Sequence, residues 1–176
     1  GVPLGQAYAQ AKEWLGLSRL GWIGNKTYSK PKRPAPPLST MSCAFVYLTF
    51  ERKIFKSTLA AFKIGDSPAT GMGEIVFPFY SNQGELLNMK HMKVERTPEG
   101  KKLPPRTEGG CALPLFGWQA LNGPERSVLI CEGEIDAMTW FQWGVPALSV
   151  PNGHASRTWL EMEWDSGQHL FADGGV

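Results

Sequence analysis

Residues 128–153 decide the fold of this chain, and they read VLICEGEIDAMTWFQWGVPALSVPNG. Residues 127–131 form a short apolar run of the kind found in buried strands. A helical segment follows at 135–143 and ends at Gly144, and residues 145–150 have the character of a second strand. The order strand, acidic turn, helix, strand predicts a βαβ unit with two parallel strands.

The acidic turn of this unit carries the first candidate functional residues. Glu132 directly follows the first strand, at the carboxyl edge where open α/β sheets bind ligands. Asp136 comes four residues later, so both carboxylates are expected on one side of the helix start. Such a pair can hold a hard divalent ion such as Mg²⁺. The alternative is that Asp136 only complements the helix dipole.

The remaining residues of the predicted helix are expected to have structural roles. Glu134 is expected to face solvent in the first turn. The aromatic residues Trp140, Phe141 and Trp143 are expected in the core. Cys131 ends an apolar strand and has no histidine nearby in sequence, so a structural role is expected rather than a nucleophilic one.

Upstream, the sequence predicts helices and a hairpin. One helix is expected at 43–50 and a second one begins near Ser57 or Thr58 and ends before Gly65. Apolar residues then alternate over 75–79 and 86–92, which predicts a β-hairpin with one apolar and one partly basic face. Residues 7–17 have the pattern of a short amphipathic helix, and the Pro- and Lys-rich residues 24–38 form a linker.

The composition of the 176 residues excludes several classes of protein. Hydrophobic residues make up 42% and charged residues 19%, which suits a chain with a packed core rather than a disordered one. No run of 18 apolar residues occurs, so no membrane span is expected. Three cysteines without CxxC spacing favour neither a disulfide scaffold nor a structural zinc site.

The charge is distributed unevenly along the chain. Between Lys90 and Arg106 there are six basic residues and two acidic ones. From Glu125 to Val176 there are eight acidic residues and two basic ones. This arrangement suits a protein that holds a polyanion on one side and metal cations on the other, and the alternative is an ordinary solvated surface.

The element E-G-E-I-D after a hydrophobic strand, with A-L-S-V-P-N-G after the helix, resembles the TOPRIM module of DnaG-like primases. The likeness is greatest to the primase half of phage primase–helicases and runs from about residue 44 to about 163. It implies an α+β or α/β fold. In that fold a small helical and β-hairpin N-terminal subdomain precedes a partial, Rossmann-like TOPRIM βαβ sheet.

The resemblance also implies a division of the chain. Residues 1–23 would be the remnant helix of a preceding zinc-binding domain, and 24–40 a Pro- and Lys-rich linker. Residues 41–124 would form the basic N-terminal subdomain of the primase core, and 125–176 a partial TOPRIM module. The zinc ligands of the family are absent, so zinc is not expected in this chain.

The resemblance assigns roles to individual residues. Glu132 matches the TOPRIM glutamate, a catalytic acid/base linked to metal, and Asp136 matches the second acid. Asp173 would be the first aspartate of the family's DxD metal motif, but Gly175 stands where the second belongs, which weakens metal binding. The residues expected to bind nucleotide or nucleic acid are Lys90, Lys93, Arg96, Lys101, Asn152 and Gly153.

The function that the resemblance implies is nucleotidyl transfer by a DNA primase. Its cofactor would be Mg²⁺ (or Mn²⁺), and its partners single-stranded DNA template, ribonucleoside triphosphates and a replicative helicase domain or protein. Its place would be the cytoplasm of a bacterial host or phage-infected cell. The alternatives are a catalytically incomplete module that binds single-stranded nucleic acid, another TOPRIM activity such as topoisomerase or nuclease, and an inactive fragment.

Overall fold

The computed structural model describes residues 27–67, 73–121 and 127–151 and contains two β-sheets. The larger sheet has four antiparallel strands in the order β1-β2-β3-β4, and the smaller has two parallel strands, β5 and β6. The strands are β1 (Gly65–Ser67), β2 (Glu74–Tyr80), β3 (Leu86–Lys93), β4 (Arg106–Thr107), β5 (Leu129–Cys131) and β6 (Ala147–Ser149).

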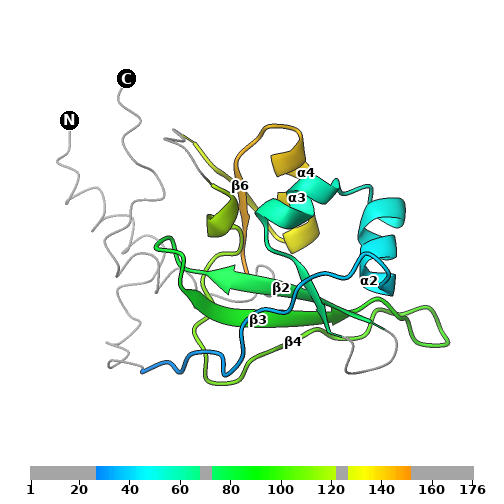
Figure 1. The fold of residues 1–176 in the computed structure, drawn as a ribbon, viewed down its shortest axis with the longest axis horizontal. Helices are drawn as coiled ribbons and strands as arrows, with labels where there is room; N and C mark the ends of the chain where they lie inside the picture. Colours follow the sequence, from blue (N-terminus) through cyan, green and yellow to red (C-terminus); the bar gives the residue numbers. More distant parts are fainter. Residues whose placement is uncertain (1–26, 68–72, 122–126, 152–176) are drawn as a thin grey trace, which may run out of the picture.

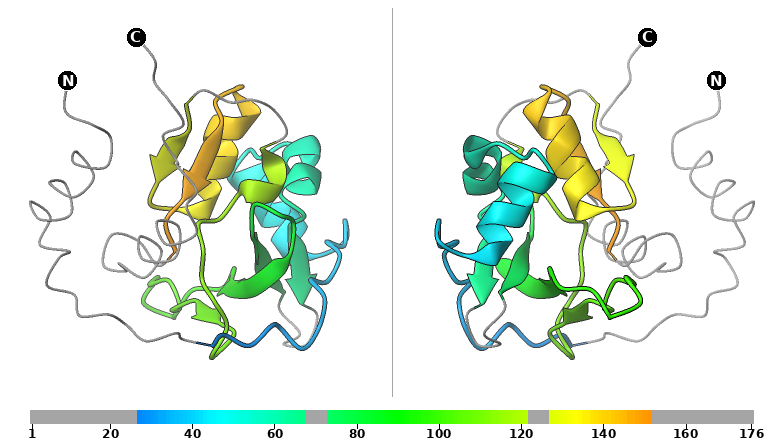
Figure 2. Two further views of the ribbon diagram at one scale, coloured as in Figure 1. Left: turned by 90° about the vertical axis from the view of Figure 1, so that its left-hand side faces the viewer. Right: turned by 90° about the vertical axis from the view of Figure 1, so that its right-hand side faces the viewer.

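Helices gather on one side of the larger sheet (Figures 1 and 2). Ser42 begins the first of them, because its hydroxyl accepts a hydrogen bond from the Phe45 N–H at 3.1 Å. None of the helices described combines the length and the apolar character that crossing a membrane requires. The helices are α2 (Cys43–Val46), the π-helix η2 (Tyr47–Glu51), α3 (Lys56–Ala61), the 3₁₀ helix η4 (Trp118–Ala120) and α4 (Glu134–Gln142).

The predicted elements upstream of the acidic turn are confirmed, and β1 is added to them. The expected helix at 43–50 is α2 continued by η2, and the expected hairpin is the pair β2 and β3. β1 is an additional strand that pairs with β2, and it is too short for periodicity to reveal. The amphipathic helix expected at 7–17 lies outside the described residues.

The predicted βαβ unit is also confirmed. β5 pairs with β6 in parallel, and α4 lies between them in the chain. The other edge of β6 is bonded to Phe116, since the Phe116 N–H donates to Ser149 O at 2.9 Å and the Ser149 N–H donates back at 3.0 Å. Gly117 follows with φ at 114°, and a Cβ there would lie 3.1 Å from Ala147 O. Glycine is therefore needed where this loop meets β6.

One aromatic cluster joins the βαβ unit to the larger sheet. The ring of Phe116 lies 5.3 Å from that of Phe62, 5.8 Å from Phe77 and 5.4 Å from Phe79. Phe62 in turn contacts Phe141 of α4 edge to face at 5.1 Å. Residues of α3, β2 and α4 therefore share a single hydrophobic core.

A buried ion pair makes the second connection between the two parts. Lys90 Nζ on β3 lies 2.8 Å from Glu134 Oε1 at the start of α4. The two side chains are only 10% and 9% exposed. The expectation that Glu134 faces solvent is therefore wrong, because the lysine compensates its charge inside the protein.

Two further expectations need correction. Phe141 belongs to the core, but Trp140 and Trp143 do not, and the exposed fraction of Trp143 is 65%.

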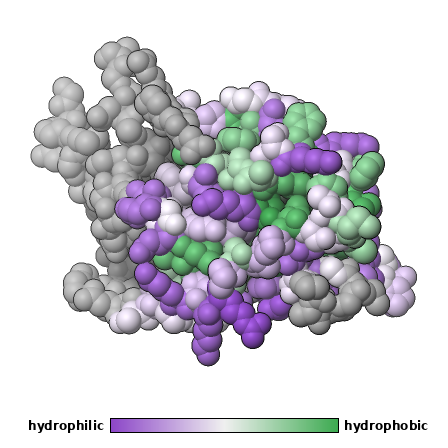
Figure 3. All heavy atoms as spheres, viewed as in Figure 1, coloured by the Kyte–Doolittle hydropathy of each residue, from purple (hydrophilic) through white to green (hydrophobic). Residues whose placement is uncertain are grey.

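The second correction concerns the predicted linker. Lys30, Lys32 and Arg33 in its described part are exposed, yet this part of the chain lies along the sheet. The Ser29 N–H donates to Gly110 O at 2.9 Å, and the Asp66 N–H donates to Pro37 O at 3.4 Å. In Figure 3, hydrophilic side chains gather in the lower part of the molecule.

The aromatic core gives a first prediction about stability. Phe116→Ala should lower the free energy of unfolding by about 3–5 kcal/mol, because it leaves a cavity among three other phenylalanines. The matched control is Phe50→Ala, since Phe50 is 66% exposed and its removal should change stability by under about 0.5 kcal/mol. Urea unfolding measures both, and similar losses in the two variants would contradict this description of the core.

The buried ion pair gives a second prediction. Lys90→Met should lower the free energy of unfolding by about 3–5 kcal/mol, because Glu134 is left charged and unpaired in the interior. The double change Lys90→Met/Glu134→Met should recover most of that loss, as two apolar side chains replace the pair. Lys93→Met on the same strand is the control and should be near neutral, because Lys93 is exposed. A double variant less stable than Lys90→Met would contradict the prediction.

Candidate functional site

The candidate site begins at the carboxyl end of β5. β5 is held in place by β6, and the Val150 N–H donates to Cys131 O at 2.9 Å. Glu132 follows Cys131 directly and is exposed. Gly133 then takes the N-cap position of α4 with an extended backbone. The helix therefore begins at Glu134, two residues after Glu132, and Glu132 belongs to the turn rather than to the helix.

Asp136 lies in the first turn of α4 and is also exposed. Its carboxylate folds back over Gly133, since Oδ2 would lie 2.7 Å from a Cβ built on that glycine. A side chain at 133 would displace the carboxylate. The glycine between Glu132 and Glu134 thus keeps space for Asp136 at the helix N-terminus, where a negative charge is favourable.

The thiol of Cys131 is affected by the negative charge of Asp136. Burial and the negative charge of Asp136 both raise the pKa of its thiol, burial being the larger cause. The group therefore stays protonated at neutral pH, and the protonated thiol is not the nucleophilic form. The chemistry of this turn is that of its carboxylates.

The two exposed carboxylates, Glu132 and Asp136, offer hard oxygen ligands on one turn. This donor set fits Mg²⁺, which commonly takes one or two carboxylates and keeps several waters. Within residues 27–67, 73–121 and 127–151, no group of three Asp, Glu, His or Cys side chains is arranged to hold a metal ion. Asp173, expected as a further ligand, lies outside the described residues, as do Asn152 and Gly153.

The predicted basic residues are not brought together on one surface. Lys90 is buried against Glu134 and pairs across the sheet with Phe77 of the core face. Lys93 pairs with Glu74 three positions further on, and side chains of a strand alternate between its faces. Lys90 and Lys93 therefore point to opposite sides of β3, and only Lys93 is exposed.

Arg96 and Lys101 lie in a tight turn after β3, and both are exposed. The Thr97 N–H donates to Lys101 O at 2.9 Å, and Arg96 Nη1 donates to Gly100 O at 3.2 Å. The Glu99 carboxylate accepts hydrogen bonds from the Thr97 side chain and from the backbone of Glu99 itself, and both lower the pKa of Glu99. The turn presents its cations to solvent, where a polyanion could reach them.

Two residues that position the acidic turn were not anticipated as such. Glu134 anchors the start of α4 through Lys90, and Gln142 anchors its end. Gln142 Oε1 accepts from the Phe55 N–H at 3.0 Å, and its Nε2 donates to Lys53 O at 3.1 Å. One sequence feature pointed to this pair: Lys90 lies in a largely apolar strand. Charged residues are almost never fully buried unless they are paired, so a buried lysine there requires an acidic partner such as Glu134.

Comparisons with known proteins bear on the fold. No protein-family model matches the sequence, and no curated protein matches it either. Solved structures of primases are similar to this chain, among them the three that follow. The primase fragment of the bacteriophage T7 primase–helicase protein is 18% identical, with a TM-score of 0.53 over 88% of this chain. The E. coli primase catalytic core is 15% identical, with a TM-score of 0.51 over 69%. A DnaG primase catalytic domain bound to single-stranded DNA is 14% identical, with a TM-score of 0.50 over 70%.

The similar structures are longer than the matched part of this chain. The chain covers 61% of the T7 fragment, 52% of the E. coli core and 53% of the DnaG domain. The described part of the chain has the mixed helix and strand arrangement that the sequence predicts. The chain therefore has the fold of DnaG-type primase catalytic cores, as its E-G-E-I-D element indicates.

Proposed function

We propose that this chain is part of a DNA primase and takes part in the synthesis of RNA primers on single-stranded DNA. The observation that carries this proposal is the exposed pair Glu132 and Asp136 at the carboxyl end of β5, in a primase-type fold. Glu134, which lies between the two in the sequence, forms a buried ion pair with Lys90, and this contact supports a defined position for the start of α4.

The reaction is a nucleotidyl transfer between ribonucleotides. A hydroxyl oxygen of one nucleotide forms a bond to the α-phosphorus of a ribonucleoside triphosphate, and pyrophosphate leaves. Glu132 is the group placed to accept the hydroxyl proton, because it is an exposed carboxylate at the strand end. Asp136 adds a second negative charge one helical turn along, which favours a cation between them.

Mg²⁺ (or Mn²⁺), when bound at Glu132 and Asp136, would neutralise phosphate charge and polarise the phosphoryl oxygens. The exposed cations Lys93, Arg96 and Lys101 would bind template or nucleotide phosphates. A helicase domain or protein is the proposed partner, and the cytoplasm of a bacterial host or phage-infected cell is the proposed location. This chain covers about half to three-fifths of the length of the similar structures. The whole activity is therefore proposed for the protein to which the chain belongs.

A binding module without catalysis is the second candidate. The observation that favours it is the absence, within the described residues, of a third acidic or other ligand beside Glu132 and Asp136. The two-metal arrangement of many nucleotidyl transfer enzymes needs carboxylate support for both ions. Such a module would hold single-stranded nucleic acid through phosphate contacts alone.

A primer-synthesis assay separates the two candidates. The chain is mixed with single-stranded DNA, labelled ribonucleoside triphosphates and Mg²⁺, and labelled primers are expected. Glu132→Gln and Asp136→Asn should each reduce the yield by about 100-fold or more, because proton transfer or cation support is lost. Glu51→Gln is the control, since Glu51 is exposed on η2 and should be neutral.

Two results of this assay would overturn the catalytic assignment. DNA binding without any product would favour the binding module for this chain. Product that is unchanged by Glu132→Gln would mean that the reaction uses other residues.

The basic turn gives a prediction about binding. The affinity for single-stranded DNA should fall steeply with salt, with a slope of log K against log salt of about −0.7 for each phosphate contact. Lys101→Gln should make the slope shallower by about 0.7, because one contact is removed. Lys56→Gln on α3 is the control and should leave the slope unchanged. Fluorescence anisotropy at several salt concentrations measures this, and equal slopes for all proteins would exclude the turn from the DNA site.

A further inference from the structure

The outer face of the larger sheet carries a second cluster of charged residues. Lys90 and His91 are consecutive on β3, so their side chains point to opposite faces of the sheet. Lys90 reaches α4, and His91 shares the other face with Arg106, its partner on β4. Whatever this face binds is therefore separated by the sheet from the start of α4, which Lys90 contacts.

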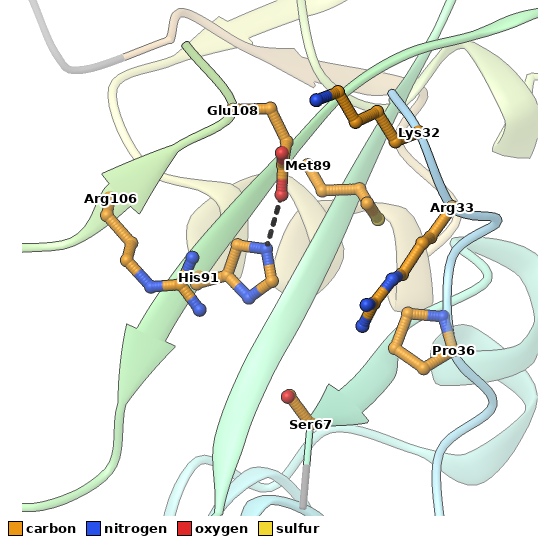
Figure 4. Close-up of a pocket in the computed structure, with 8 residues that line it drawn as sticks. All are labelled: Lys32, Arg33, Pro36, Ser67, Met89, His91, Arg106 and Glu108. Carbon is orange, nitrogen blue, oxygen red and sulfur yellow. Dashed lines mark hydrogen bonds and ion pairs between the residues drawn. The ribbon is translucent and has the colours of Figure 1, made fainter. Parts of the chain in front are cut away.

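The segment of residues 29–37 covers part of this outer face and leaves a pocket of about 630 Å³ beneath it. The segment is held closely, because Pro36 O occupies the place that a Cβ on Gly65 would take. Lys32 and Arg33 of the segment form one wall of the pocket, and Arg106 lies across from them (Figure 4). The volume falls in the range of small-molecule sites.

His91, Arg106 and Glu108 line the pocket and are joined in a network of charged side chains with the buried Glu74. Arg106 Nη2 lies 2.8 Å from Glu74 Oε2, and His91 Nδ1 lies 3.5 Å from the same oxygen. His91 Nε2 lies 3.3 Å from Glu108 Oε1. The side chain of His91 is only 9% exposed, yet its Nδ1 forms no hydrogen bond in the described structure. Glu74 Oε2 is the ion-pair partner of this ring nitrogen but does not form a hydrogen bond with it, so the nitrogen keeps the capacity for a hydrogen bond to a ligand.

The charges of the pocket favour an anion. Arg106 is engaged by Glu74, and His91 lies between Glu74 and Glu108. Lys32 and Arg33 are not so compensated, because neither forms a hydrogen bond or ion pair within the described residues. Two exposed cations that face the guanidinium of Arg106 across a pocket suit the binding of phosphate oxygens.

We propose that this pocket binds a phosphorylated small molecule of nucleotide size, on the opposite side of the sheet from the face that Lys90 shares with α4. Lys32, Arg33 and Arg106 hold its phosphates, and His91 supplies a further polar contact. Met89 and Pro36 provide apolar walls for the rest of the molecule. This site is independent of the proposed primer synthesis, because it uses none of the residues assigned to that reaction.

Calorimetric titration of the whole chain in EDTA tests the proposal. The probes are adenosine triphosphate, pyrophosphate, adenosine and a single-stranded oligonucleotide. Adenosine triphosphate and pyrophosphate should each bind at one site, and adenosine should bind at least tenfold more weakly. Lys32→Gln and Arg33→Gln should each weaken triphosphate binding about tenfold, as expected for one lost charged hydrogen bond.

Matched variants assign the binding to the pocket. Lys30→Gln changes a lysine of the same segment that pairs with Glu85 outside the pocket, and it should leave the affinity unchanged. The double variant Glu132→Gln/Asp136→Asn should also bind normally, even if it makes no primers. In the folded wild type, the ring resonances of His91 should shift on titration, which gives a readout that needs no substitution.

Four results would overturn the proposal. These are no binding of either phosphate compound, binding of the oligonucleotide alone, an equal loss in Lys30→Gln and Lys32→Gln, and a loss confined to Glu132→Gln/Asp136→Asn. The first two would show that the pocket takes no small phosphate compound. The last two would show that the binding is unspecific or belongs to the acidic turn.

Discussion

The packing of Phe116 between two otherwise separate parts is the constraint on which the rest of the structure depends. Two short parallel strands and one helix cannot bury a core of their own, and β5 is largely exposed. The βαβ unit is held because α4 packs on the phenylalanine cluster through Met138 and Phe141, while Leu148 of β6 packs with Leu115 and Val150. Gly117 allows this contact, since any side chain there would collide with β6. The position of the acidic turn is therefore set by a core that belongs mostly to the preceding subdomain.

A buried ion pair also helps to fix the start of α4, in addition to the hydrophobic packing. The ion pair of Lys90 and Glu134 adds no net charge beneath the turn, so the field above it is dominated by Glu132 and Asp136. A buried pair of this kind adds little to stability compared with apolar residues, but it is strongly specific, because either partner alone is unfavourable. It fixes the start of α4 against β3 in one arrangement. The position of the turn that carries these carboxylates thus depends on a lysine that is itself buried.

The sequence was informative wherever one local pattern decided the outcome. The βαβ unit and the hairpin β2–β3 follow from apolar runs, alternation and turn residues, and the structure contains both. Burial of individual charges and aromatics could not be read in the same way. Glu134 looks like any first-turn acid until its partner 44 positions upstream is known. Trp140 and Trp143 look like core residues, yet they lie on a side of α4 that the described residues leave exposed. Such properties depend on tertiary neighbours, which periodicity does not identify.

The alternation along β3 has a consequence for how this protein can evolve. Asn88 ties the strand to the following loop through hydrogen bonds to Glu108 O, Cys111 O and Ala112 O, so its register is fixed. Lys90 and His91 then serve two separate charge clusters from adjacent positions. Substitution can change either cluster without touching the other. Gain or loss of a single codon in this strand would exchange the two side chains between faces and ruin both at once. The length of β3 is thus constrained by the contacts on both faces of the sheet.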